Sequence, residues 1–174
     1  MRGSLRIDAA GYDDPDAARL IEEVQQEYVV RYGGRDDSPL DPAGFAPPAG
    51  LFLVGYLGGI GVACGGWRAH RPGAGTDAEI KRMYVTPAAR GCGLARRMLA
   101  ELERTARAAG YQRVILETGS KQPEAVGLYR SSGYTDIPAY GYYAGSPHSM
   151  HFAKLPGGAG EVTAEPASDG RAGQ

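Results

Sequence analysis

A glycine-rich loop between a strand-like run and a strongly amphipathic segment restricts the fold more than any other feature of the chain. The loop reads Arg90-Gly91-Cys92-Gly93-Leu94-Ala95. Glycine lets the backbone turn tightly and approach a ligand closely, and the first N–H groups of a helix have no partner within that helix. A glycine loop at the start of a helix therefore predicts a binding site for a phosphate group.

The segments around this loop predict an α/β domain. Polar and apolar residues alternate over 79–85, which predicts a strand, whereas 93–109 carries a single apolar face, which predicts a helix. Two apolar runs, 51–57 and 60–67, flank a pair of glycines and predict a hairpin, so three antiparallel strands precede the loop. Further strands are expected at 5–9, 113–117 and 149–155, and further helices at 15–32 and 123–132.

Length and charge limit the class of protein. A chain of 174 residues can form one domain with a hydrophobic core but not two of ordinary size. The formal net charge is -1 and no basic block stands out, which argues against a nucleic-acid partner. Because no segment has the apolar length of a membrane span and the first residues lack the apolar part of a signal peptide, we expect a cytoplasmic protein without a membrane partner.

The cysteines and the C-terminal segment complete this outline. Cys64 and Cys92 are the only cysteines, which is too few for a disulfide framework or a metal-ligand set, so we expect reduced thiols and no metal. Residues 157–174 are polar and rich in glycine and alanine, and we expect them to form a disordered tail. The sequence thus predicts one domain over residues 1–156, and it leaves a homodimer open.

Two common phosphate-binding motifs do not fit the loop. A dinucleotide site requires G-x-G-x-x-G/A, and Arg96 occupies the position of the last small residue. A nucleoside-triphosphate loop requires Gly-Lys-Ser/Thr, which does not follow here. When the pattern is written Q/R-x-x-G-x-G/A, however, Arg90, Gly93 and Ala95 match it without a gap.

This pattern resembles the pyrophosphate loop of the GNAT superfamily, the acetyl-CoA-dependent N-acyltransferases. The resemblance extends to Glu79-Ile80-Lys81-Arg82-Met83-Tyr84-Val85 before the loop and to Leu128-Tyr129-Arg130-Ser131-Ser132-Gly133-Tyr134 after it, and it covers about residues 51–155. It implies an α/β fold with a mixed, mostly antiparallel central sheet that splays in the middle and carries helices on both faces. The implied domain over 1–156 is a single N-acetyltransferase domain.

The resemblance also implies how acetyl-CoA is held as a cosubstrate. The pantetheine arm would lie like an extra strand in the splay and would bond to the backbone of Met83 and Val85. The pyrophosphate would rest on the backbone amides of the loop and the helix start, namely those of Arg90, Gly91, Cys92, Gly93, Leu94, Ala95 and Arg96. Main-chain bonding of this kind tolerates varied side chains.

Two side chains are the candidates for proton transfer. In the family a tyrosine protonates the leaving thiolate, and Tyr129 occupies its place; a phenol suits this task because its pKa near 10 is close to that of an alkyl thiol. Packing in the core is the alternative role for Tyr129. Glu79 lies where some members carry a glutamate base that acts through a water, and a salt bridge to Lys81 or Arg113 is its alternative. The backbone N–H of Met83 would face the oxyanion.

The implied reaction is transfer of an acetyl group from acetyl-CoA to a primary amine of a small molecule, by direct attack in a ternary complex. A CoA-binding sensor or interaction module without turnover is one alternative, and acylation of a protein or peptide amine is another. The acceptor pocket of the family corresponds here to regions that contain Tyr28, Arg31, Tyr32, Trp67, Arg68, Tyr140, Tyr142 and Tyr143.

Overall fold

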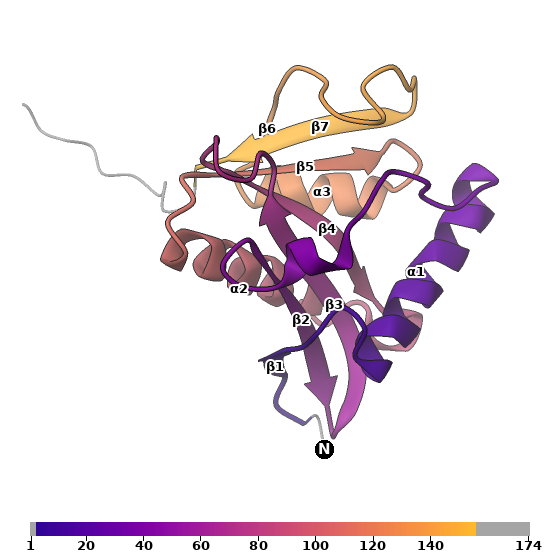
Figure 1. Ribbon diagram of the computed structural model, residues 1–174. Helices are drawn as coiled ribbons and strands as arrows, with labels where there is room; N and C mark the ends of the chain where they lie inside the picture. The colour runs from indigo at the N-terminus through magenta and orange to yellow at the C-terminus, as the bar shows by residue number, and fades with distance from the viewer. Residues whose placement is uncertain (1–2, 156–174) are drawn as a thin grey trace, which may run out of the picture.

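The computed structural model describes residues 3–155, which form a seven-stranded sheet in the order β1-β2-β3-β4-β5-β7-β6 (Figure 1). The strands are β1 (Arg6–Ala9), β2 (Gly50–Leu57), β3 (Ile60–Ala69), β4 (Asp77–Val85), β5 (Arg113–Gly119), β6 (Thr135–Asp136) and β7 (Ser149–Lys154). The helices are α1 (Pro15–Tyr32), α2 (Leu94–Ala108) and α3 (Pro123–Ser131), with short 3-10 turns η1 (Pro42–Phe45) and η2 (Pro87–Ala89). The tail predicted at 157–174 lies outside the described residues.

The strands β2, β3 and β4 are consecutive and antiparallel, as the sequence predicted, and β1 adds to β2 as an antiparallel edge strand. Gly58 and Gly59 form the turn between β2 and β3 with φ values of 56° and 81°, which glycine adopts without strain. Asp14 caps α1 by accepting bonds from the backbone N–H groups of Asp16 and Ala17. The two-residue strand β6 was not expected, since so short a run carries no periodicity.

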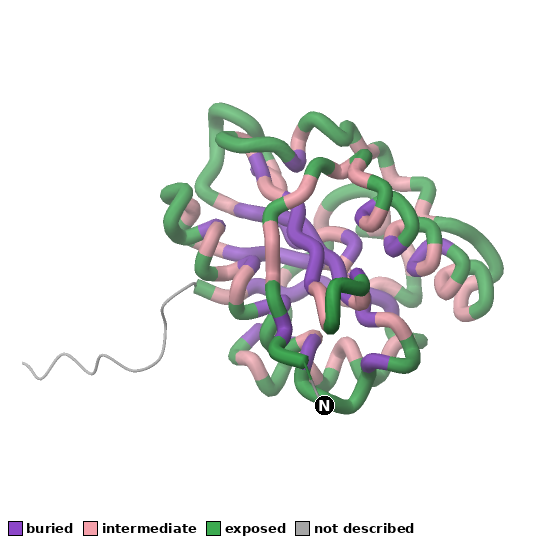
Figure 2. Tube along the Cα trace, turned by 90° about the horizontal axis from the view of Figure 1, so that it is seen from below, coloured by how far each residue is buried: buried purple, intermediate pink, exposed green. Residues whose placement is uncertain are grey.

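Helices cover both faces of the sheet, which confirms the expected layering. On one face α1 and η1 pack through a cluster that includes Leu20, Val24 and Phe52. On the other face α2 and α3 pack through a second cluster that includes Met98 and Phe152. Figure 2 shows the buried positions running through the central strands, with the loops exposed around them. The sheet therefore separates two hydrophobic clusters.

The sheet splays where β4 meets β5. These two strands are parallel and pair only from Asp77 with Arg113 to Glu79 with Ile115. Further along β4, Arg82 and Met83 form a bulge between the paired residues Lys81 and Tyr84, and the backbone of Arg82 has a φ of 58°. A bulge bends a strand and increases its twist. The C-terminal part of β4 consequently has a free edge that faces the gap.

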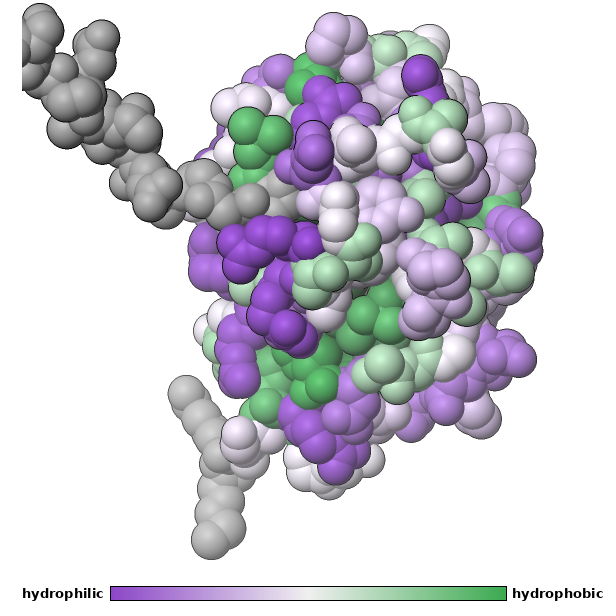
Figure 3. Space-filling view, turned by 60° about the vertical axis from the view of Figure 1, so that its left-hand side comes forward, coloured by the Kyte–Doolittle hydropathy of each residue, from purple (hydrophilic) through white to green (hydrophobic). Residues whose placement is uncertain are grey.

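The surface in Figure 3 mixes hydrophilic and hydrophobic side chains, and the hydrophobic ones gather in a patch below the centre of the view. Among the helices between residues 3 and 155, none combines the length and the apolar character needed to cross a bilayer.

Candidate active site

The glycine loop leads into α2 in a conformation that suits an anion. Gly91 and Gly93 have φ values of 81° and 78°, in the left-handed region that favours glycine. Gly93 is also the N-cap of α2, and because it has no side chain, it supplies no side-chain oxygen to the first N–H groups of the helix. Those N–H groups and the positive end of the helix dipole therefore suit the pyrophosphate of an acyl-CoA.

Side chains of the loop fix it to the rest of the fold. Arg90 donates from Nε to the carbonyl oxygen of Val85 at 2.9 Å and from Nη2 to Glu27 at 2.8 Å. Arg96 donates to the hydroxyls of Ser131 and Ser132 at the end of α3. The loop thus lies at the end of the free edge of β4. The Val85 carbonyl oxygen on that edge already accepts a hydrogen bond from Arg90. Leu94 is buried in the core, Ala95 is half-buried and Cys92 is exposed.

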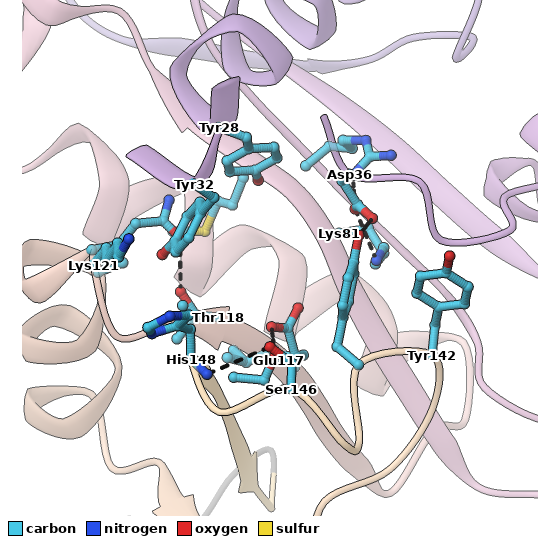
Figure 4. Close-up of a pocket in the computed structure, with 18 of the residues that line it drawn as sticks. Tyr28, Tyr32, Asp36, Lys81, Glu117, Thr118, Lys121, Tyr142, Ser146 and His148 are labelled. Atoms are coloured by element: carbon cyan, nitrogen blue, oxygen red, sulfur yellow. Dashed lines mark hydrogen bonds and ion pairs between the residues drawn. The ribbon is translucent and has the colours of Figure 1, made fainter. Parts of the chain in front are cut away.

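A cavity of about 420 Å³ opens into the gap between β4 and β5 (Figure 4). Its walls come from the end of α1 and the loop after it, from residues 80–83 and 116–119 of the two strands, from α3, and from the loop before β7. The volume lies near the lower end of the range for small-molecule sites. The free edge of β4 connects this cavity with the glycine loop.

Tyr129 lies on α3 with 7% of its surface exposed, and it lines the cavity. Its ring also packs against Tyr134 and Phe152, with ring centroids 5.6 Å and 6.4 Å away. Burial raises the pKa of Tyr129, with a further contribution from the charge of Glu117. The phenol therefore stays protonated at neutral pH. Both sequence interpretations of Tyr129, a core aromatic and a group at the reaction centre, are compatible with this position.

Glu79 lies away from the cavity walls. It is buried at the start of β4, and its carboxylate accepts two bonds from the guanidinium of Arg68, at 3.1 Å and 3.0 Å. The partners considered from the sequence pair elsewhere: Arg113 with Asp77, and Lys81 with Asp36. Met83 does line the cavity, next to the bulge. The structure thus brings Met83 and Tyr129 together and leaves Glu79 apart from them.

A second carboxylate, which sequence reasoning missed, belongs to the cavity. Glu117 is half-buried on β5, and its Oε1 accepts a bond from the hydroxyl of Ser149 at 2.9 Å. Burial raises the pKa of Glu117, although the Ser149 bond and the charge of Lys81 oppose the shift. The signal in the sequence was a lone acidic residue at the end of the apolar run Val114-Ile115-Leu116. A carboxyl group with a raised pKa in a cleft is a candidate general base.

Asp36, in the loop after α1, gathers four side chains at the edge of the cavity. Its carboxylate accepts from Lys81 at 3.4 Å, Ser38 at 2.6 Å and Tyr143 at 2.8 Å, and it forms a close ion pair with Arg82. Although burial alone would raise the pKa of Asp36, Lys81 and Arg82 hold it well below its usual range. This cluster fixes the loop after α1 and the loop before β7 to β4.

The acceptor residues expected from the sequence divide into two groups. Tyr28, Tyr32, Tyr142 and Tyr143 line the cavity. The others lie elsewhere: Arg31 pairs with Glu124, Trp67 donates to Thr105, Arg68 pairs with Glu79, and Tyr140 packs between His70 and His151. Four of the eight expected residues, all of them tyrosines, therefore line the cavity.

The splayed mixed sheet, the glycine loop before α2 and the cavity at the gap between β4 and β5 together define a class of acyltransferase fold. The model of the acetyltransferase (GNAT) family matches residues 17–134, and the chain belongs to this family. Members use an acyl-CoA cosubstrate, and the uncapped start of α2 and the free edge of β4 fit such a ligand.

Individual relatives agree with this assignment. The chain is 37% identical over 136 residues to the IAA acetyltransferase of Azospirillum brasilense, covering 78% of this chain and 88% of that protein. It is 32% identical over 133 residues to YjgM of Escherichia coli (strain K12), an uncharacterized N-acetyltransferase, covering 72% of this chain and 78% of that protein. A crystal structure from Klebsiella pneumoniae, described as an acyl-CoA N-acyltransferase, superimposes with a TM-score of 0.71 at 28% identity, covering 87% of this chain and 97% of that one.

Proposed function

We propose that the protein transfers an acetyl group from acetyl-CoA to a primary amine of a small molecule, by direct attack in a ternary complex. One observation carries the proposal: the glycine loop and the 420 Å³ cavity lie at two points along the same free edge of β4. A cosubstrate that is anionic at one end and reactive at the other fits this arrangement. The acceptor would enter the cavity from the side of the loop after α1 and the loop before β7.

The glycine loop and the free edge of β4 would hold different parts of acetyl-CoA. The N–H groups from Gly91 to Arg96 would hold the pyrophosphate. The backbone of Lys81 to Met83 would bond to the pantetheine arm as one strand bonds to another. Val85 lies in the same edge, although its carbonyl accepts from Arg90 in this structure, so a bond to that oxygen requires Arg90 to move.

Three groups suit the three tasks of the reaction. Glu117 accepts a proton from the acceptor ammonium, so that the free amine attacks the thioester carbon. The backbone N–H of Met83, at the bulge, faces the oxygen that becomes negative. The C–N bond forms, the C–S bond breaks, and Tyr129 donates its proton to the departing sulfur. The nitrogen then loses its second proton, which restores the Tyr129 phenol, so the products are the amide and the free thiol of CoA. Glu79 remains the alternative base, acting from a greater distance through water.

The dimensions of the site favour a small acceptor over a protein or peptide amine. Tyr143 reaches from the loop before β7 to the backbone N–H of Asp37 at 3.1 Å and to its neighbour Asp36, so two loops meet at the edge of the cavity. A polypeptide acceptor requires an open groove, and these contacts narrow the entrance. Acyl groups longer than acetyl would demand additional depth beside Tyr28 and Tyr129.

Two measurements test the proposal. Calorimetric titration of acetyl-CoA into the protein should show saturable binding, and a thiol-release assay with a panel of primary amines and short peptides should show turnover with a small amine. A sensor would bind acetyl-CoA and release no thiol above background. Turnover with peptides alone would assign the acceptor to the protein class, and absence of binding would refute the proposal altogether.

A further inference from the structure

Positive charge exceeds negative charge in the cluster beside the cavity. Lys81 and Arg82 both pair with the single carboxylate of Asp36, so the cluster carries a net charge of one positive unit. Lys81 and Arg82 have only 11% and 4% of their side-chain surface exposed, so water neutralises this charge poorly. Buried charge without a counter-charge is costly. A ligand with a negative group would remove that cost.

Both cations retain donors that the described residues leave free. The ammonium of Lys81 has three N–H bonds, and its partners within residues 3–155 are Asp36 at 3.4 Å and the hydroxyl of Ser38 at 3.2 Å. In the same part of the chain, Arg82 Nε is buried and has no hydrogen-bond partner. Both residues line the cavity. The site therefore offers unused donors as well as unbalanced charge.

Glu117 lies on the opposite strand of the gap and does not supply the missing counter-charge throughout the reaction. If it takes the proton of the acceptor ammonium, it becomes neutral at the moment when the amine attacks. Among residues 3–155, Asp36 is then still the one carboxylate that forms an ion pair with Lys81 and Arg82, and the excess positive charge of the cluster is not balanced. Figure 4 shows Lys81 beside Asp36, with Glu117 apart from them and beside Ser146. Because Lys81 and Glu117 line the same cavity, a small molecule with a polar group at each end can reach both.

We infer that the acceptor is an amine that also carries a carboxylate, as an amino acid does, with the carboxylate on Lys81 and the amine toward Glu117. This inference rests on the proposed function and specifies its acceptor. Lys81 acts as a specificity residue in it, while Asp36 and Ser38 hold the ammonium in place. A charge-assisted bond of this type contributes about 1.5 to 3 kcal/mol, which corresponds to roughly a 10- to 150-fold difference in kcat/KM.

Matched acceptors test the inference on the wild-type protein. The thiol-release assay would compare each of the common amino acids with its amide and with its decarboxylated amine, and would include amino acids with longer spacing between amine and carboxylate. We expect the best acceptor to be a free acid, with kcat/KM at least about tenfold above that of its amide and its decarboxylated amine. Amides or simple amines that equal or exceed the acids would overturn the inference while leaving the proposed function intact.

Paired variants locate the recognition. Lys81→Met should bring the kcat/KM ratio of acid to amide close to one, whereas Lys81→Arg should retain a preference for the acid. Lys121→Met is the matched control, because Lys121 also lines the cavity but lies at Tyr32, away from Asp36; it should keep the wild-type ratio. A Lys81→Met protein that still prefers the acid contradicts the role of Lys81. Absence of thiol release with every acceptor would instead refute the proposed function.

Discussion

The phenol of Tyr32 lies directly over the Cα of Gly119, so closely that a Cβ at Gly119 would be 1.7 Å from the Tyr32 hydroxyl oxygen. Tyr32 ends α1 and Gly119 ends β5, and both line the cavity. Glycine is required at position 119 because Tyr32 leaves no space for a Cβ. The backbone conformation does not require it, since the φ of Gly119 is not in the left-handed region. The contact therefore sets the position of one wall of the cavity.

Gly119→Ala should displace the Tyr32 ring and lower kcat/KM by about tenfold or more, because a small misplacement of a wall that positions substrate costs reactivity. Steady-state kinetics checks this. Gly127→Ala is the matched control: Gly127 lies inside α3 with nothing within 4 Å of a Cβ, and alanine should stabilise that helix by roughly 0.5–1 kcal/mol. Equal activity of the two variants would contradict the role given to the Tyr32 contact.

The pH dependence of the reaction distinguishes the two carboxylates. The pKa of Glu117 is raised, and a base works only when deprotonated, so kcat/KM should fall as the pH drops through a value above the usual carboxyl pKa of about 4.3. Glu117→Gln should remove this fall at low pH, the acidic limb of the pH–rate profile, and should lower kcat at least about a hundredfold. A complete pH–rate profile of the variant is the measurement.

Glu79→Gln serves as the comparison for Glu117. It weakens the pair with Arg68 and should reduce the free energy of unfolding by about 1–3 kcal/mol while leaving the acidic limb in place. Urea denaturation and the same pH–rate profile give the two readings. If Glu79→Gln removes the limb and Glu117→Gln keeps it, the base is Glu79.

Tyr129→Phe retains the ring that packs against Tyr134 and Phe152 and removes only the hydroxyl. We expect kcat to fall by about a hundredfold, in the range for loss of a general acid, with little change in the affinity for CoA. Kinetics and calorimetric titration measure the two quantities. Tyr134→Phe is the control, since its hydroxyl bonds to Glu103 and lies away from the cavity. Unchanged kcat in Tyr129→Phe would leave Tyr129 a packing residue.

Asp36→Asn should destabilise the protein by about 3 kcal/mol, because Lys81 and Arg82 would lose their shared partner in a buried place. The pKa of Asp36 is lowered on folding, so its contribution is complete above the unfolded carboxyl pKa of about 3.9 and is lost as the pH falls toward the lower folded value. Urea denaturation at several pH values measures this. Asp37→Asn, at an exposed neighbour, should have little effect.

Gly93→Ala should weaken CoA binding through the backbone. A residue with a side chain pays of order 1 kcal/mol or more at a φ of 78°, and any relaxation of the loop moves its N–H groups away from the pyrophosphate. Affinity for CoA should fall, whereas affinity for pantetheine, which lacks the phosphates, should not. Gly141→Ala, at a φ of 73° in the loop before β7, is the matched control. Equal losses for both ligands would argue against the loop as the pyrophosphate site.

The elements that could be predicted from the sequence are those specified by neighbouring residues. The Gly58-Gly59 turn, the Asp14 cap and the apolar face of α2 each follow from a few adjacent positions. The cavity depends instead on distant contacts. Asp36 meets Lys81 and Arg82 across 45 and 46 residues, and Ser149 meets Glu117 across 32. No local periodicity encodes such pairs, so the contacts of the loop after α1 could not be predicted from the sequence.

The short parallel ladder between β4 and β5 also has a consequence for folding. In the first leaf of the sheet the hairpins β2–β3 and β3–β4 join segments adjacent in sequence, whereas the second leaf, made of β5, β7 and β6, continues the sheet from β4 through three residue pairs, next to the Asp77–Arg113 ion pair across 36 residues. Docking over such a separation is slow relative to local pairing. A cosubstrate that bonds along the open edge while touching both leaves favours the docked state, so its binding would stabilise the contact between the two leaves.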